Sequence, residues 1–150
     1  MFSRRVKRAK QRRHLRRACR RPGLVIGLTG SVAMGKSTAA ALLKYLAVPV
    51  FDADAAVHEL LGPRGAAVKA ISERFPGATT ASGIDRKALG AKVFADPQAL
   101  ADLEAIIHPL VRVRRERFLA KAAFRRQQVV ALDIPLLFEG KLENLCDLVV

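Results

Sequence analysis

Short apolar runs alternate with helical stretches along the chain from Leu24 onward. Three runs are short, apolar and bounded by turn residues, which is typical of buried strands; they cover residues 24–29, 48–51 and 129–134. The last of these is nearly continuous in apolar residues, as expected of a central parallel strand buried on both faces. A fourth run starts at Asp147 and reaches Val150. The order of strands and helices predicts an α/β fold with a parallel sheet.

Helical periodicity fills most of the remaining chain. The alanine-rich stretch 37–46 predicts a helix with an apolar stripe of Leu42, Leu43 and Leu46. Residues 55–123 predict a helical insertion between the second and third strands. Its expected parts are a helix at 55–61, a helix carrying Val68, Ile71 and Phe75, a polar loop at 77–83, a helix capped by Asp85 with Leu89, Val93 and Phe94 on its apolar side, and a long helix that starts at Asp96-Pro97.

The loop between the first strand and its helix reads Gly30-Ser31-Val32-Ala33-Met34-Gly35-Lys36-Ser37. It fits G-x-x-x-x-G-K-[ST], a phosphate-binding pattern that requires a strand before it and a helix after it. Backbone N–H groups of the loop and of the helix start would face the β-phosphate of a nucleotide. Lys36 would lie between the β- and γ-phosphates, and the Ser37 hydroxyl would reach Mg²⁺. The alternative is a glycine turn before a core helix, with Lys36 solvated.

Carboxylates follow the other two predicted strands. Asp52 and Asp54 come after the second strand, and Asp133 lies at the end of the third. Ligands of parallel α/β sheets bind beyond the carboxyl ends of the strands, where a carboxylate can hold Mg²⁺ or accept a proton from an attacking hydroxyl. The alternative for Asp54 is to cap the helix at 55–61.

The net charge of +14 is concentrated at the N-terminus. Residues 1–21 hold eleven Lys or Arg and no acid, whereas the rest of the chain holds sixteen Lys or Arg against thirteen acids, a net charge of +3. We expect residues 1–22 to form a disordered basic arm. It could bind phosphates, target the protein, or be sequence translated upstream of the true start. Another class of function would be a nucleic-acid-binding NTPase that uses this arm. The body has one Tyr and no Trp, which argues against it and against nucleic acid as a partner.

Two further bulk features restrict the class of protein. No apolar run is long enough to cross a membrane, which predicts a soluble protein. Cys19 and Cys146 have no metal or redox spacing, which fits a reducing cytoplasm. We expect one domain over residues 23–150 and a monomer without a membrane partner.

The motifs together resemble the dephospho-CoA kinase family. The resemblance rests on five segments in the family's order: residues 27–38, 50–54, 85–89 with Val93-Phe94, 107–110 and 135–139. It implies a P-loop kinase-like fold, a three-layer αβα arrangement with a parallel sheet and a helical CoA-binding region at about 55–123. It also implies transfer of phosphate from MgATP to the 3′-hydroxyl of dephospho-CoA.

The resemblance assigns roles residue by residue. Residues 30–38 would bind the ATP phosphates; this range comprises Gly30, Ser31, Val32, Ala33, Met34, Gly35, Lys36, Ser37 and Thr38. Asp54 would orient the acceptor hydroxyl as a base, with Lys36 as its catalytic partner on the ATP side. The acceptor site would include Arg86, Lys87, His108 and Glu139, and Mg²⁺ would be held by Ser37 and Asp133. The alternatives are a solvated helix face for Arg86 and Lys87, and a helix-packing imidazole for His108.

The chain departs from the family in two ways. The loop interior, 31–34, holds less glycine than is usual in the family. The family pattern also continues past Val150 into a lid with arginines, so the resemblance implies a domain that is incomplete at its C-terminal end. Two alternatives to a dephospho-CoA kinase stay open. One is another small-molecule P-loop kinase with a different acceptor, and the other is an inactive fragment that binds nucleotide.

Overall fold

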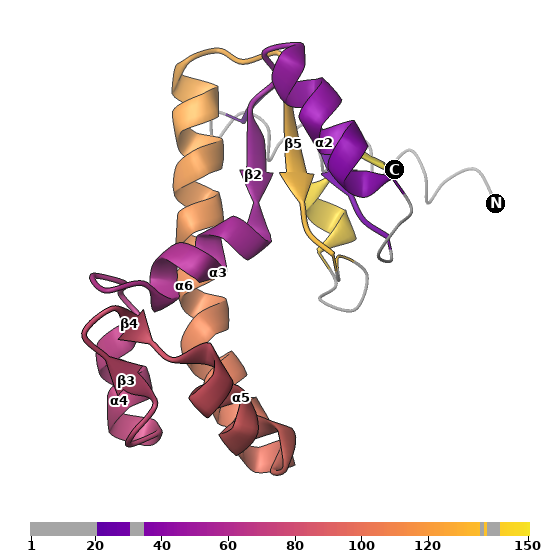
Figure 1. The fold of residues 1–150 in the computed structure, drawn as a ribbon. Coiled ribbons are helices and arrows are strands. Elements are labelled where there is room, and N and C mark those ends of the chain that lie inside the picture. The colour runs from indigo at the N-terminus through magenta and orange to yellow at the C-terminus, as the bar shows by residue number, and fades with distance from the viewer. Residues whose placement is uncertain (1–20, 31–34, 136, 138–141) are drawn as a thin grey trace, which may run out of the picture. The chain divides into compact units, whose positions relative to one another are not determined.

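The structure is a computed structural model that describes residues 21–30, 35–135, 137 and 142–150. The predicted basic arm therefore lies, apart from Arg21 and Pro22, outside the described residues. The elements, in chain order (Figure 1), are β1 (Leu24–Leu28), α2 (Lys36–Tyr45), β2 (Val50–Asp52), α3 (Ala53–Leu61), α4 (Val68–Arg74), β3 (Thr79–Thr80), β4 (Gly83–Ile84), α5 (Arg86–Phe94), α6 (Pro97–Phe124), β5 (Val129–Asp133), the 3₁₀ helix η1 (Glu143–Leu145) and β6 (Leu148–Val149).

The chain divides into two compact units. The sheet unit comprises Met1–Phe51 and Arg117–Val150, and the helical unit comprises Asp52–Glu116. Helix α6 starts in the helical unit and ends in the sheet unit.

The sheet has the strand order β2-β5-β1-β6. Strand β1 pairs in parallel with β5, in a register that runs from Leu24 opposite Val129 to Leu28 opposite Asp133, and it pairs in parallel with β6 on its other side. The arrows of β2 and β5 point the same way in Figure 1. Residues 130–132 of β5 are fully buried, as expected of a central strand covered on both faces. The predicted α/β class with a parallel sheet is confirmed.

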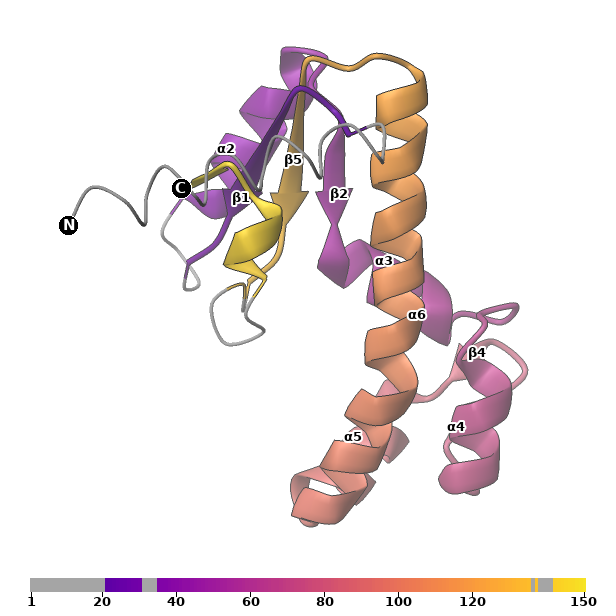
Figure 2. The same cartoon turned by 180° about the vertical axis from the view of Figure 1, so that it is seen from behind.

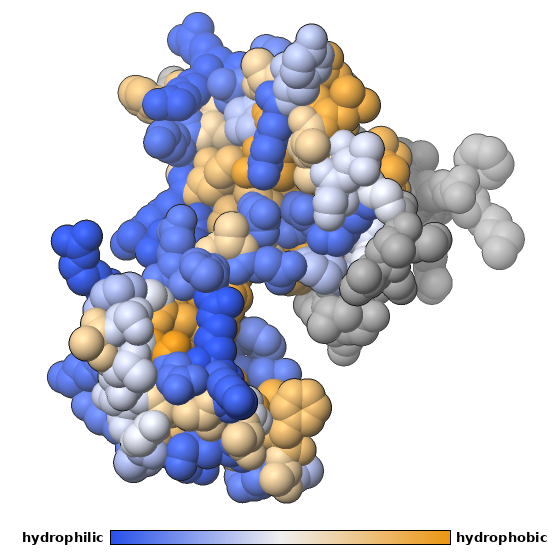
Figure 3. All heavy atoms as spheres, in the orientation of Figure 1, coloured by the Kyte–Doolittle hydropathy of each residue, from blue (hydrophilic) through white to orange (hydrophobic). Residues whose placement is uncertain are grey.

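Helix α2 packs on this sheet through fewer leucines than its sequence predicted. Ala40 and Leu43 face Leu28 and Ala131 in one apolar cluster. Leu42 and Leu46 are 57% and 61% exposed, and apolar side chains gather on the surface in the region of α2 in Figure 3. The predicted stripe is therefore wrong, because the helix turns the 40/43 side toward the sheet.

Close packing fixes strands β2 and β1 of the sheet unit. The ring of Phe118 on α6 lies 5.7 Å from that of Phe51 on β2, and Figure 2 shows the last turns of α6 beside β2. On the other side, Gly27 of β1 lies against the segment before β6. A Cβ at Gly27 would come within 2.7 Å of Cys146 Sγ and 2.9 Å of Leu137 Cδ1, so this strand position requires glycine.

The helical unit has a core of its own. Its buried side chains come from all of its helices and from the turn that joins them: they are Leu60, Ala67, Ile71, Phe75, Ala78, Ile84, Leu89, Val93, Ala99 and Ile107. Two details differ from the sequence prediction. The loop predicted at 77–83 contains a short antiparallel hairpin, in which Thr79 pairs with Ile84 and Thr80 with Gly83. Phe94, predicted on the apolar side of α5, is 94% exposed, because it lies at the last residue of that helix.

An ion pair joins α4 to α6 within the helical unit. Arg74 Nε and Nη2 lie 2.7 and 2.6 Å from Asp102 Oδ2, and Gln98 Nε2 donates to Asp102 Oδ1 at 2.9 Å. The hydrogen bond from Gln98, followed by that from Arg74, lowers the pKa of the Asp102 carboxyl below its ordinary value of 3.8.

This lowered pKa predicts an acid-sensitive contribution to stability. A carboxyl with a lowered pKa in the folded state stabilises the fold above its unfolded pKa, and the contribution disappears as the pH falls through the folded pKa. We expect Asp102→Asn to lower the urea midpoint by a constant amount from neutral pH down to about pH 5. Below 3.8 the difference from wild type should shrink. Urea unfolding of both proteins across this range measures it, and a difference that does not change with pH would contradict the prediction.

Candidate active site

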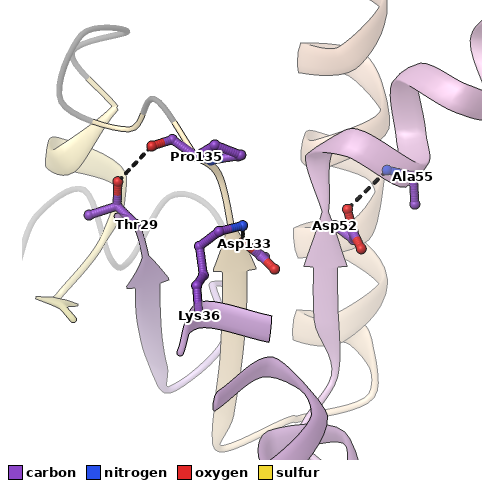
Figure 4. A network of polar contacts seen from close by, with 6 residues as sticks. All are labelled: Thr29, Lys36, Asp52, Ala55, Asp133 and Pro135. Carbon is purple, nitrogen blue, oxygen red and sulfur yellow. Dashed lines mark hydrogen bonds and ion pairs between the residues drawn. The ribbon is translucent and has the colours of Figure 1, made fainter. Parts of the chain in front are cut away.

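Lysine and aspartate meet at the carboxyl ends of β1 and β5. Asp133 is the last residue of β5 and lies opposite Leu28 of β1, and Lys36 is the first residue of α2. Lys36 Nζ lies 2.6 Å from Asp133 Oδ1, and the two side chains are only 18% and 9% exposed. Figure 4 shows the lysine reaching from the start of α2 to the end of β5. The predicted phosphate-loop lysine and the predicted magnesium-binding aspartate are therefore direct neighbours.

The backbone beside this pair is held by strand-end hydrogen bonds. Thr29 Oγ1 donates to the Pro135 carbonyl at 3.0 Å (Figure 4). The Ile134 N–H donates to the Leu28 carbonyl at 3.1 Å. These two bonds extend the β1–β5 pairing one step past the strands, so the chain enters the glycine loop from a fixed position.

The start of α2 is suited to an anion. Its N-cap is Gly35 with φ 80°, a left-handed conformation that favours glycine. In the described part of the chain, no side chain caps the start of α2, and its first turn holds no acidic residue. The backbone N–H groups at this helix start are therefore not capped by a carboxylate of the helix. Ser37 and Thr38 follow in the first turn and are exposed. The uncapped helix start and the adjacent Lys36 ammonium both attract negative charge. Ser31, Val32, Ala33 and Met34 lie outside the described residues.

The protein groups that could hold a metal here are few. Among the described residues, no cluster of three or more His, Cys, Asp or Glu could hold a metal ion. Mg²⁺ is usually bound by one or two protein oxygens together with substrate phosphates and water. Asp133 and the Ser37 hydroxyl are of that type, so these two described residues fit a magnesium ion that arrives with a nucleotide.

The two aspartates after β2 have different surroundings. Asp52 is the N-cap of α3, and its Oδ1 accepts from the Ala55 N–H at 2.9 Å (Figure 4). Asp54 lies in the first turn of the same helix and is exposed. The alternative in which Asp54 caps this helix is wrong, because α3 starts two residues earlier than its sequence suggested and Asp52 is its N-cap. The Asp54 carboxylate does not cap the helix. Its negative charge is favoured by the helix dipole, because it lies in the first turn.

The predicted acceptor residues of the helical unit lie on different elements. Arg86 and Lys87 begin α5 behind the cap of Asp85, which accepts from the Lys87 and Ala88 N–H groups. His108 is exposed on α6, so the alternative of a packing imidazole is wrong. Glu139 lies outside the described residues.

One polar residue of this unit was missed by the sequence reasoning. The Arg86 Nη2 group contacts His58 Nδ1, which joins α5 to α3. The available signal was spacing, because His58 follows Asp54 by four residues on one helix and residues so spaced share a face.

Comparisons with known proteins decide the family. A family model described as "Dephospho-CoA kinase" matches residues 24–150. The chain belongs to the dephospho-CoA kinase family. Curated relatives of that name include those of Rhodospirillum rubrum, 59% identical over 83% of this chain, and Gluconobacter oxydans, 54% identical over 83%. The chain spans 59% and 62% of the length of these two relatives.

Solved structures agree with this dephospho-CoA kinase family assignment. The Campylobacter jejuni dephospho-CoA kinase matches with a TM-score of 0.69 and 29% identity, covering 83% of this chain and 64% of that one. The structure of TT1252 from Thermus thermophilus matches with a TM-score of 0.72 and 37% identity, covering 84% of this chain and 63% of that one. The P-loop kinase fold predicted from the sequence is confirmed. In the part of the chain that the structure describes, no helix has the length and apolar character needed to cross a membrane.

Proposed function

We propose that this chain binds MgATP and transfers the γ-phosphoryl group to the 3′-hydroxyl of the ribose of dephospho-CoA, which yields coenzyme A and ADP in the cytoplasm. The observation that carries the proposal is the Lys36–Asp133 pair, 2.6 Å apart at the carboxyl ends of β1 and β5, in a chain whose family model is dephospho-CoA kinase.

The sheet unit would supply the ATP side. The backbone N–H groups at the uncapped start of α2 would bind the β-phosphate, and Lys36 would exchange its contact with Asp133 for phosphate oxygens. Asp133 and Ser37 would then hold Mg²⁺, which supplies charge neutralisation at the transferring phosphoryl group. A buried carboxylate thus keeps a cationic neighbour in either state, first the ammonium and then the metal.

The helical unit would supply the acceptor side. Asp54 would accept the proton of the 3′-hydroxyl as its oxygen bonds to the γ-phosphorus, while the bond from that phosphorus to the bridging oxygen breaks and releases ADP. The exposure of Asp54 and the assignment of the cap to Asp52 support this role. Arg86, Lys87, His108 and Glu139 would bind the acceptor.

An acceptor panel tests the function. The chain is incubated with γ-labelled ATP and dephospho-CoA, pantetheine, adenosine and other small hydroxyl acceptors in separate reactions. We expect label in coenzyme A alone, with the phosphate on the 3′-oxygen by mass spectrometry. Transfer to another acceptor with none to dephospho-CoA would show a different small-molecule kinase. Nucleotide binding without any transfer would show a fragment that binds nucleotide only.

A further inference from the structure

Arg86 contacts an imidazole of the same helical unit. The Arg86 Nη2 group, at the first residue of α5, contacts His58 Nδ1 in the second turn of α3, and both side chains are exposed. A guanidinium only donates hydrogen bonds, so the imidazole nitrogen must be the acceptor.

We propose that His58 is a positioning residue, which fixes the guanidinium of Arg86 for an anionic group of the acceptor while Asp54 faces the acceptor's hydroxyl. The proposal rests on the proposed function, since it names the residue that orders one of its acceptor groups. His58 itself does not touch the reacting atoms.

Arg86 differs from three other arginines of the helical unit in the charge of its partner. Arg74 pairs with Asp102, Arg112 with Glu116, and Arg114 with Glu59, at distances of 2.6, 2.9 and 2.7 Å. Each of these guanidinium groups has its charge balanced by a carboxylate. An imidazole carries no negative charge to balance that of the guanidinium. It can therefore restrict the rotamers of Arg86 while the positive charge of Arg86 stays available to a ligand. An arginine that is already ordered loses less entropy when it binds an anion.

The carboxylate nearest in sequence does not take the place of His58. Asp85 precedes Arg86 directly, but its Oδ1 accepts from the Lys87 and Ala88 N–H groups as the cap of α5. Arg86 and Lys87 therefore add two positive charges at a helix start, where the helix dipole disfavours cations. The arrangement costs stability in the free protein and would be favourable once an anion is bound there.

Spacing relates His58 to the proposed base. Asp54 and His58 are four residues apart on α3, are both exposed, and lie about 6 Å apart along its axis, a little more than one helical turn. One face of α3 thus presents a carboxylate for the hydroxyl and, one turn further, the imidazole that holds the cation. Loss of His58 would leave Arg86 less ordered for the anionic group of the acceptor and would leave Asp54 in place for the hydroxyl.

The test is a double-mutant cycle read by binding. Calorimetry measures the Kd for dephospho-CoA and, separately, for MgATP in wild type, His58→Ala, Arg86→Ala and the double variant. We expect His58→Ala to raise the Kd for dephospho-CoA about tenfold, as for loss of one hydrogen bond to a charged group. It should change the Kd for MgATP little. In the Arg86→Ala background, His58→Ala should cause no further loss, because His58 acts through Arg86.

Two side-chain replacements sharpen the test. His58→Asn places an amide oxygen where Nδ1 lies and should restore most of the affinity. Glu59→Gln, at an exposed position of the same helix, is the matched control and should leave the Kd unchanged. Additive effects of His58→Ala and Arg86→Ala, or no loss in His58→Ala, would overturn the proposal.

Nitrogen NMR of the free protein separates this proposal from the proposed function. We expect His58 to show a protonated Nε2 and an unprotonated Nδ1 that accepts a hydrogen bond, whether or not dephospho-CoA binds. A protonated Nδ1 would overturn the positioning role. Wild-type protein that shows the expected tautomer but binds no dephospho-CoA would overturn the proposed function, and with it the acceptor that Arg86 is held for.

Discussion

Lys36→Ala should remove measurable MgATP binding by this chain. The variant loses one contact with the nucleotide and one ion pair of the free protein. The ammonium that would contact the β- and γ-phosphates is lost, and the Asp133 carboxylate, only 9% exposed, loses its partner at 2.6 Å. The contact of the ammonium with the phosphates is the term that acts on the Kd. Removing one partner of a desolvated charge pair formed on binding costs about 2–5 kcal/mol, which corresponds to at least about 30-fold in Kd. Titration with a fluorescent ATP analogue in the presence of Mg²⁺ measures the change.

The matched control for this variant is Lys44→Ala. Lys44 lies in the last turn of the same helix and is exposed, so its loss should leave the Kd unchanged. Circular dichroism of both variants shows whether α2 still forms. If Lys36→Ala folds and binds MgATP with wild-type affinity, the loop is not the phosphate site and the proposed ATP side of the reaction fails.

Periodicity was sufficient to predict the sheet. The apolar run at 129–134 was predicted as a central strand, and the structure places β5 between β1 and β2 with residues 130–132 fully buried. Local patterns were less informative where tertiary packing decides. Leu42 and Leu46 are as apolar as Leu43, and their sequence does not show which side of α2 meets Leu28 and Ala131. The Thr79–Ile84 pairing is too short to leave a periodic signal.

Some residues of the candidate site could be predicted from a local motif, and others could not. The motif located Lys36 and Ser37, and its strand context located Asp133, because the phosphate pattern carries its own structural surroundings. The start of α3 was misplaced by two residues, which is the usual error of boundaries read from capping residues when two aspartates compete. The His58–Arg86 contact joins residues 28 apart in sequence, and no local pattern predicts which exposed imidazole an arginine will meet.

The corrected start of α3 makes the second large prediction specific to one carboxylate. With Asp52 assigned to the cap, Asp54→Asn removes an exposed charge and no described hydrogen bond of the cap. We expect kcat for transfer to dephospho-CoA to fall about 10²- to 10⁴-fold, the range for loss of a general base. The Kd for MgATP should stay close to wild type. A coupled ADP-release assay and a nucleotide titration measure the two quantities.

Asp52→Asn is the matched control for Asp54→Asn, because asparagine caps a helix about as well as aspartate. It makes the same change of charge two residues away and should keep both the fold of α3 and most of the activity. The comparison therefore separates a base from a general need for negative charge after β2. Equal losses in the two variants would indicate an electrostatic effect of the segment, and wild-type transfer in Asp54→Asn would remove that carboxylate from the mechanism. A loss confined to Asp54→Asn requires a role for this one side chain in the reaction, since α3 keeps a side-chain cap in both proteins.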